Sequence, residues 1–121
     1  MKTTLMALAL IIGLAPLDSE KVSWQGATTH DFGEIKHREP VTHEFVFKNI
    51  SGKALKIDNV RPSCGCTNPD WPDTTIKPDS TASIHIEYDA RDAGYFYKSI
   101  KVYFKGQRRA EWLFIEGTVL E

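Results

Sequence analysis

The 121-residue chain has two cysteines, which lie one residue apart in the segment Pro62-Ser63-Cys64-Gly65-Cys66-Thr67. On an extended chain such residues have Cα atoms about 6.6 Å apart, which is near the upper limit for a disulfide. A bond between Cys64 and Cys66 therefore needs a bend, and Gly65 permits one. Because the closed ring is so small, the bond would stabilise the fold by only about 1.5 kcal/mol. It would also be easily reduced.

The same two thiols allow two other kinds of chemistry. Two thiolates in a proline-flanked loop favour soft ions such as Cu(I) or Zn(II). A closed zinc site needs four ligands, however, and the four histidines are scattered singly, with no ligand spacing from the pair. Arg61 could favour a reactive thiolate, but no thioredoxin-like alternation of strand and helix surrounds it. A structural role for Cys64 and Cys66 is favoured, and a metal or redox role remains the alternative.

The sequence lacks the motifs of common catalytic sites. It has no Gly-rich phosphate loop, no Gly-x-Ser-x-Gly and no His-Glu-x-x-His. A hydrolytic carboxylate pair would require folding to bring two acidic side chains together in a cleft, the candidates being Glu34, Glu44, Glu87 and Asp89. We therefore expect no enzymatic activity and no resident cofactor.

Three tryptophans allow two interpretations. Trp71 follows Asp70 in an expected loop, where it either plugs one end of the domain or stays exposed and binds a partner. The plug is favoured because a tryptophan buries about 200 Å², and Trp24 and Trp112 are interpreted in the same way. Trp71 and Arg61 are thus the candidate binding residues of this region.

The N-terminal segment has the layout of a secretory signal. Lys2 precedes an unbroken apolar run that stops at Asp18. The run is too short to span a bilayer comfortably, which takes about 20 residues. We therefore predict a signal peptide over residues 1–19, a periplasmic or extracellular location, and no stable membrane span after cleavage. An oxidising compartment would allow the Cys64–Cys66 bond.

The remainder of the chain alternates with the period of β-strands. In the segment 81–88, apolar residues alternate with polar ones, and the segment 95–104 has one aliphatic face and one aromatic face with polar tips. Turn residues separate the expected strands, which lie at residues 30–35, 41–49, 54–60, 74–76, 81–88, 95–104 and 110–119. This pattern predicts an all-β fold, an immunoglobulin-like antiparallel β-sandwich of about seven strands, in one domain over residues 22–121.

Charge gives no sign of a nucleic-acid partner. The chain has 15 lysines and arginines against 16 acidic residues, a net charge of −1. No global field therefore attracts the protein to DNA or RNA. The one concentrated group of basic residues, between positions 98 and 109, is interpreted as a solvated edge that resists aggregation.

Several motifs together resemble the bacterial domain of unknown function 1573. They are the runs His30-Asp31-Phe32-Gly33-Glu34-Ile35, Phe45-Val46-Phe47-Lys48-Asn49-Ile50-Ser51-Gly52, Leu55-Lys56-Ile57, Pro62-Ser63-Cys64-Gly65-Cys66-Thr67, Ile76-Lys77-Pro78-Asp79-Ser80 and Gly94-Tyr95-Phe96. The resemblance covers most of the chain after residue 28. Asp79 departs from the glycine often found in that turn. The resemblance implies an exported immunoglobulin-like sandwich, similar to major-sperm-protein and Hydin-type domains, and it implies no activity.

These observations combine into one functional hypothesis. The chain is expected to be an exported, non-catalytic interaction or scaffold module that contacts another envelope or extracellular protein. Contact could use an uncovered strand edge or the loops at one end of the sandwich. The alternative is a copper- or zinc-handling or thiol-redox protein based on Cys64 and Cys66. The oligomeric state is left open.

Overall fold

A computed structural model describes residues 20–121, so the signal peptide predicted over residues 1–19 lies outside the described part. Residues 20–121 form eight strands: β1 (Val22–Trp24), β2 (Thr29–Ile35), β3 (Val41–Asn49), β4 (Ile57–Pro62), β5 (Thr67–Asp70), β6 (Thr81–Tyr88), β7 (Gly94–Phe104) and β8 (Glu111–Val119). They make two four-stranded sheets. Sheet A has the order β1-β3-β6-β5, and sheet B has the order β2-β8-β7-β4.

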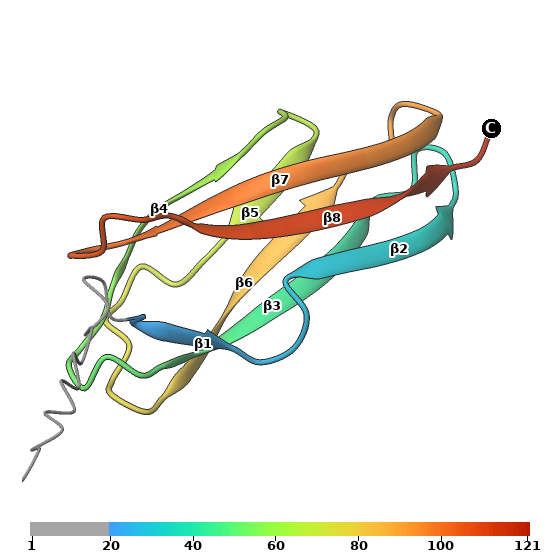
Figure 1. Ribbon diagram of the computed structural model, residues 1–121. Coiled ribbons are helices and arrows are strands. Elements are labelled where there is room, and N and C mark those ends of the chain that lie inside the picture. Colours follow the sequence, from blue (N-terminus) through green and yellow to red (C-terminus); the bar gives the residue numbers. More distant parts are fainter. Residues whose placement is uncertain (1–19) are drawn as a thin grey trace, which may run out of the picture.

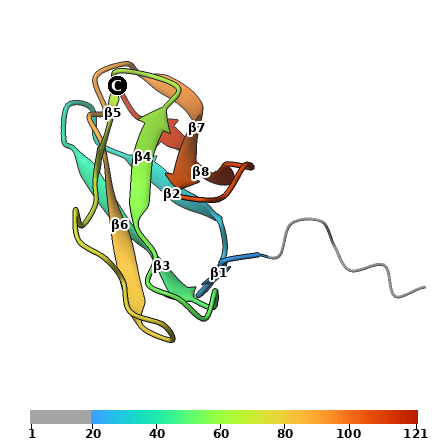
Figure 2. The ribbon, with the colours of Figure 1, turned by 90° about the vertical axis from the view of Figure 1, so that its left-hand side faces the viewer.

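The two sheets pack face to face, and this confirms the predicted immunoglobulin-like sandwich (Figures 1 and 2). Every strand pairing is antiparallel except that of β2 with β8, which is parallel. The exception arises because the chain changes sheets early. It leaves sheet A at the end of β1, crosses over at residues 25–28, and enters sheet B as β2. Within residues 20–121, no helix has the length and apolar character needed to cross a membrane.

The core lies between the sheets and follows the two-residue period of the strands. In β6, Ile84 and Ile86 are fully buried, while their sequence neighbours point away from the core. Phe47 of β3 and Phe104 of β7 meet edge to face across the two sheets, with ring centroids 5.2 Å apart. The alternation read from the sequence therefore does place the apolar residues inside the sandwich.

Some strand positions differ from the prediction. No strand was predicted over the segment that β5 occupies, which contains Pro69. β5 is an edge strand that pairs only with β6, and a proline is tolerated at such an edge. The strand expected at residues 74–76 is reduced to an isolated bridge between Leu55 and Ile76. The three-residue strand β1 was also not predicted, because so short a segment carries almost no periodic signal.

Candidate functional site

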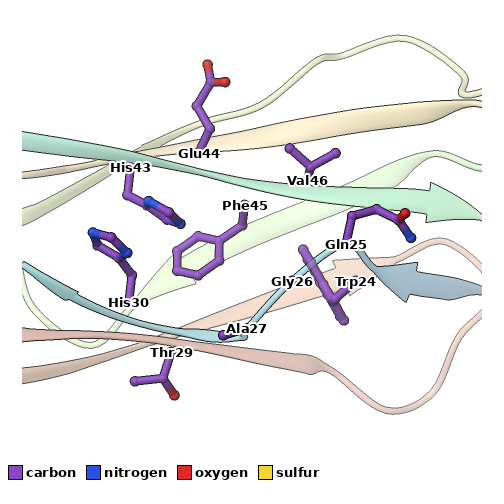
Figure 3. A pocket seen from close by; sticks show the side chains of 10 residues that line it. All are labelled: Trp24, Gln25, Gly26, Ala27, Thr29, His30, His43, Glu44, Phe45 and Val46. Carbon is purple, nitrogen blue, oxygen red and sulfur yellow. The ribbon is translucent and has the colours of Figure 1, made fainter.

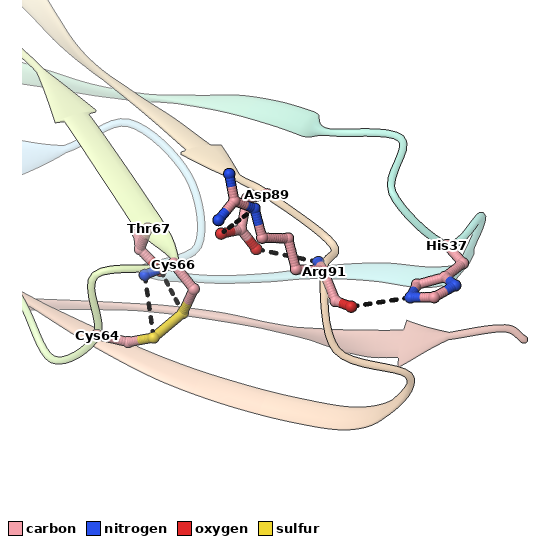
Figure 4. Close-up of polar contacts among 6 residues, drawn as sticks. All are labelled: His37, Cys64, Cys66, Thr67, Asp89 and Arg91. Atoms are coloured by element: carbon pink, nitrogen blue, oxygen red, sulfur yellow. Dashed lines mark hydrogen bonds and ion pairs between the residues drawn. A yellow bond between two sulfur atoms is a disulfide. The ribbon is translucent and has the colours of Figure 1, made fainter.

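Cys64 and Cys66 are joined by a disulfide in the structure, with Cα atoms 5.1 Å apart. Their loop connects β4 of sheet B to β5 of sheet A (Figure 4). The backbone N–H of Cys66 donates a hydrogen bond to Sγ of Cys64 at 3.1 Å, and the N–H of Thr67 donates to the Cys64 carbonyl at 3.2 Å. These short-range hydrogen bonds close the tight bend that a disulfide between Cys64 and Cys66 requires.

Hydrogen bonds attach this loop to the neighbouring turn at the same end of the sandwich. The N–H of Asp89 donates to the Cys66 carbonyl at 3.0 Å. The Asp89 carboxylate accepts a hydrogen bond from the Arg91 backbone N–H at 3.1 Å, and the Arg91 carbonyl lies 2.8 Å from Nε2 of His37 (Figure 4). On its other side the loop is held by the Ser63 N–H, which donates to the Ser99 carbonyl at 2.9 Å, and anchoring on both sides supports a role in fixing local shape.

In the described part of the chain, the cysteine pair does not belong to any larger group of metal-binding side chains. Within residues 20–121, no group of three or more histidines, cysteines and acidic residues is arranged to hold a metal ion. On the outer face of sheet A, Nδ1 of His85 instead lies 3.7 Å from the Oε1 atom of Glu44. Arg61 lies on β4, with its guanidinium carbon 5.8 Å from the centre of the Tyr103 ring. The metal alternative therefore depends on the two sulfur atoms alone.

Two of the four candidate carboxylates line one depression. Glu87 and Asp89 border an open cavity of about 890 Å³ together with Arg38 and Arg91. The Arg91 Nε atom lies 3.7 Å from the Asp89 carboxylate, so this group is already partnered by a cation. Glu44 lies apart from them, beside His85. The shared depression is therefore a surface cluster of opposite charges.

The three tryptophans have different environments. Trp24 and Trp71 are half-buried and pack against the core, as the plug interpretation predicts. Trp71 also lines a shallow pocket of about 430 Å³ beside His85. The plug interpretation is wrong for Trp112, whose side chain is 47% exposed. Trp112 occupies an outward position of β8, because its neighbour Leu113 points into the core.

Trp112 belongs to a row of aromatic side chains on the outer face of sheet B. We call this row the aromatic stripe, and it consists of Tyr95 and Tyr97 of β7 with Trp112 and Phe114 of β8. Phe114 lies between Tyr97 and Trp112, with ring centroids at 5.5 and 6.2 Å and planes nearly parallel. Tyr95 is 68% exposed, and its hydroxyl donates a hydrogen bond to Glu116 at 2.8 Å.

A cation extends the stripe. Lys101 of β7 pairs in register with Trp112 of β8, which places Nζ of Lys101 4.8 Å from the centre of the Trp112 ring. Such a contact between an ammonium group and an aromatic face is attractive. The aromatic face of the segment 95–104 was visible in the sequence, but the pairing of β7 with β8 was needed to join it to Trp112 and Phe114.

A second feature brings two histidines together, although they appeared to be scattered singly in the sequence. His30 of β2 and His43 of β3 stack with ring centroids 3.7 Å apart and thereby join the two sheets (Figure 3). Each ring also meets a phenylalanine edge to face at 4.6 Å, Phe32 for His30 and Phe45 for His43. Burial, with a further contribution from the charge of nearby His30, lowers the pKa of His43 below its usual 6.5.

The lowered pKa of His43 predicts a dependence of stability on pH. In the unfolded chain His43 binds a proton near pH 6.5, whereas in the folded chain it binds the proton only at a lower pH. The free energy of unfolding should therefore fall as the pH decreases from about 6.5 through the lower pKa of the folded state. His43→Phe, measured by urea unfolding at several pH values, should flatten this decrease. His37→Gln, at an exposed histidine, should leave the decrease as it is. An unchanged pH profile in His43→Phe would contradict the interpretation.

Solved structures share this architecture. The chain superimposes on the PapD-like domain 7 of human CEP192 with a TM-score of 0.72 and 10% sequence identity, covering 98% of this chain and 99% of that one. A crystal structure of a protein of unknown function from Porphyromonas gingivalis W83 gives a TM-score of 0.69 with 15% identity. That match covers 90% of this chain, which spans about half, 51%, of the P. gingivalis chain. These matches show that the chain has an immunoglobulin-like sandwich fold, which it shares with this PapD-like domain.

The sequence identifies the particular family. Residues 23–119 match the family described as "Protein of unknown function (DUF1573)", and the chain belongs to this family. The comparison with curated proteins finds no match. The same sandwich also matches part of a family 123 glycoside hydrolase from Clostridium perfringens, with a TM-score of 0.70, 12% identity, and coverage of 84% of this chain and 28% of the hydrolase chain. At these identities the structural matches show the fold alone.

Proposed function

We propose that this protein is an exported, non-catalytic interaction module that binds another envelope or extracellular protein through the aromatic stripe. The carrying observation is the exposure of Tyr95, Tyr97 and Trp112 on one rigid sheet face. An aromatic side chain has about 200 Å² of surface. Because each of these three residues is about half exposed or more, together they present roughly 300 Å² to water. A patch of about 300–600 Å² is the largest found on a typical monomer and is often functional.

The residue types of the stripe favour a protein partner with an acidic surface. Tyrosine, tryptophan and arginine dominate the binding energy of protein interfaces. Lys101 and Arg61 lie against aromatic rings of this face. Further exposed cations follow in the turn between β7 and β8, namely Lys105, Arg108 and Arg109. Carboxylates on the partner would complement these cations and would orient the two surfaces.

Export is proposed from two features of the chain. The predicted signal peptide would direct it out of the cytoplasm. The bond between Cys64 and Cys66 is compatible with an oxidising compartment, where disulfides persist. The partner would then be found in the periplasm, in the cell envelope or outside the cell.

The stripe can be tested by affinity capture from an envelope extract, with the full chain as bait. A partner bound through the stripe should bind Trp112→Ala about thirtyfold more weakly, because truncation of a hot-spot residue costs about 2 kcal/mol. Lys101→Glu should reduce capture if the partner is acidic. The matched control is Lys53→Glu, a charge reversal at an exposed residue in a loop of the described domain. Equal capture by the wild type and both stripe variants would reject the proposal.

The alternative function, metal handling or thiol redox chemistry at Cys64 and Cys66, makes a different prediction. If the bond only fixes the loop, Cys64→Ser should lower the free energy of unfolding by about 1.5 kcal/mol, because a three-residue ring restricts the unfolded chain little. The capture of the partner should remain unchanged. Stoichiometric Cu(I) or Zn(II) in the reduced protein, lost in Cys64→Ser, would instead support the alternative.

A further inference from the structure

We infer that the open edge of β3, from Val41 to Val46, accepts an extended peptide segment of a partner protein, which adds a strand to sheet A. This edge belongs to sheet A, whereas the aromatic stripe lies on the outer face of sheet B. The inference is therefore independent of the proposed function. Strand addition is a known mode of peptide recognition, in which backbone hydrogen bonds provide affinity and side-chain pockets provide specificity.

The hydrogen-bonding pattern of β3 shows which backbone groups are free. β3 pairs with β6 from Val41 to Lys48, and the N–H of Asn49 donates to the Ser80 carbonyl on that same side. The odd-numbered residues of β3 therefore direct their backbone groups toward β6. The even-numbered residues Thr42 and Glu44 direct theirs to the opposite side. No strand of residues 20–121 pairs with them there.

The edge is open because β1 is short and the chain then leaves sheet A. β1 pairs with β3 only from Trp24 opposite Phe47 to Val22 opposite Asn49. One further bond runs from the Gln25 N–H to the Val46 carbonyl at 2.8 Å. The chain then crosses to β2 in sheet B, so the position beside Val41–Val46 that a longer β1 would fill remains free (Figures 1 and 3).

A small pocket adjoins this free edge. It has a volume of about 240 Å³, and its lining includes Trp24, His30, His43 and Phe45. Figure 3 shows these side chains between β3 and the segment that leads into β2. The pocket is smaller than the cavities of about 300–1,000 Å³ that hold drug-sized ligands. It therefore fits one large apolar side chain of an added strand, whose alternate residues would face the sandwich interior.

Three other edge strands carry a proline or a register irregularity, whereas the segment Val41–Val46 carries neither. Edge strands are commonly protected by prolines, bulges or short length. β5 contains Pro69, β2 has a register irregularity between Asp31 and Glu34, and β4 has one between Ile57 and Asn59. The segment Val41–Val46 keeps a continuous register with β6 and contains no proline. It is thus a regular edge that is free to pair.

A proline substitution can remove one free N–H without disturbing sheet A. The N–H of Glu44 points away from β6, so Glu44→Pro should preserve the β3–β6 pairing, as prolines are tolerated on strand edges. Glu44→Ala is the matched control, because it removes the side chain and retains the N–H. Circular dichroism would verify that both variants are folded.

The probe is a phage-displayed library of random peptides of about ten residues, panned against the full chain. Enriched peptides should contain a large apolar residue within an extended segment. They should bind the wild type and Glu44→Ala equally, and Glu44→Pro about tenfold more weakly. Amide hydrogen exchange on the wild type should show new protection at Thr42 and Glu44 when such a peptide binds, and this readout does not depend on the folding of a variant.

Three results would overturn the inference. The first is panning that yields no binder sensitive to Glu44→Pro. The second is a bound peptide that protects neither Thr42 nor Glu44 from exchange. The third is a dimer of the chain that is lost in Glu44→Pro, because a second copy and not a peptide would then occupy the edge.

Discussion

Phe47→Ala is expected to lower the free energy of unfolding by about 3–5 kcal/mol, the range observed when a large buried aromatic is truncated. Phe47 is fully buried at the centre of the sandwich. Its ring meets Phe104 of sheet B at 5.2 Å and Trp24 at 5.5 Å, so the substitution removes contacts that hold the two sheets together. Urea unfolding followed by tryptophan fluorescence measures the loss.

The matched control for this prediction is Tyr95→Ala. Tyr95 is an aromatic residue of β7, but it lies on the outer face of sheet B and is largely exposed. Its truncation should change stability by less than about 1 kcal/mol, since surface substitutions have small effects. Equal losses at Tyr95 and Phe47 would show that the assignment of inner and outer faces is wrong.

Asn49→Asp is expected to lower the free energy of unfolding by about 3 kcal/mol or more at neutral pH. Asn49 is completely buried at the end of β3. Its Nδ2 group donates hydrogen bonds to the carbonyls of Lys53 at 2.7 Å and Ile76 at 2.9 Å. An ionised carboxylate cannot donate, so both carbonyls lose the hydrogen bond from residue 49, and a charge is buried. Urea unfolding measures the decrease in the free energy of unfolding. This decrease should be smaller at acidic pH, where the new carboxyl group is protonated.

Asn59→Asp provides the control for this substitution. Asn59 is partly exposed on β4, and its side-chain oxygen accepts a hydrogen bond from the Val60 N–H at 2.9 Å. A carboxylate keeps this acceptor and remains in contact with water, so stability should change by less than about 0.5 kcal/mol. If the two substitutions had the same effect, Asn49 would not be the buried hydrogen-bonding centre that connects β3 with the bridge residue Ile76.

Local patterns determine how much of this fold can be predicted from the sequence. Ile84 and Ile86 alternate with polar residues, and this period is sufficient to place a buried strand. β5 has no such period, because its identity depends on pairing with β6 and its Pro69 suggests a loop. The β-propensity of a segment depends strongly on its neighbours, and these are not visible from a single strand.

The same distinction applies to the candidate sites. Cys64 and Cys66 are separated by one residue, so their proximity is visible in the sequence, although the spacing left a disulfide, a metal site and a redox pair as alternatives. The stack of His30 on His43 joins two strands in different sheets, and the free edge of β3 results from the crossing of the chain at residues 25–28. Neither the histidine stack nor the free edge is indicated by a local sequence pattern. Both become visible only when the path of the chain between the sheets is known.

The structural matches also indicate where function should be sought. Sandwiches with TM-scores near 0.7 occur in a human PapD-like domain and in part of a bacterial glycoside hydrolase. One architecture thus occurs in proteins of different kinds, and function depends on the site rather than on the fold. For this family member, we therefore propose that function be sought at the exposed stripe of sheet B and at the open edge of β3.

The central proposal, that the aromatic stripe binds a protein partner, is tested most directly by photo-crosslinking in living cells. A photoreactive phenylalanine analogue replaces Tyr95 at the exposed end of the stripe, and a second variant carries it at the exposed residue Thr81 of sheet A. We predict a discrete adduct with another envelope protein from position 95 only, and its loss when Lys101→Glu is added. The absence of an adduct at position 95, or equal adducts at both positions, would contradict the proposal.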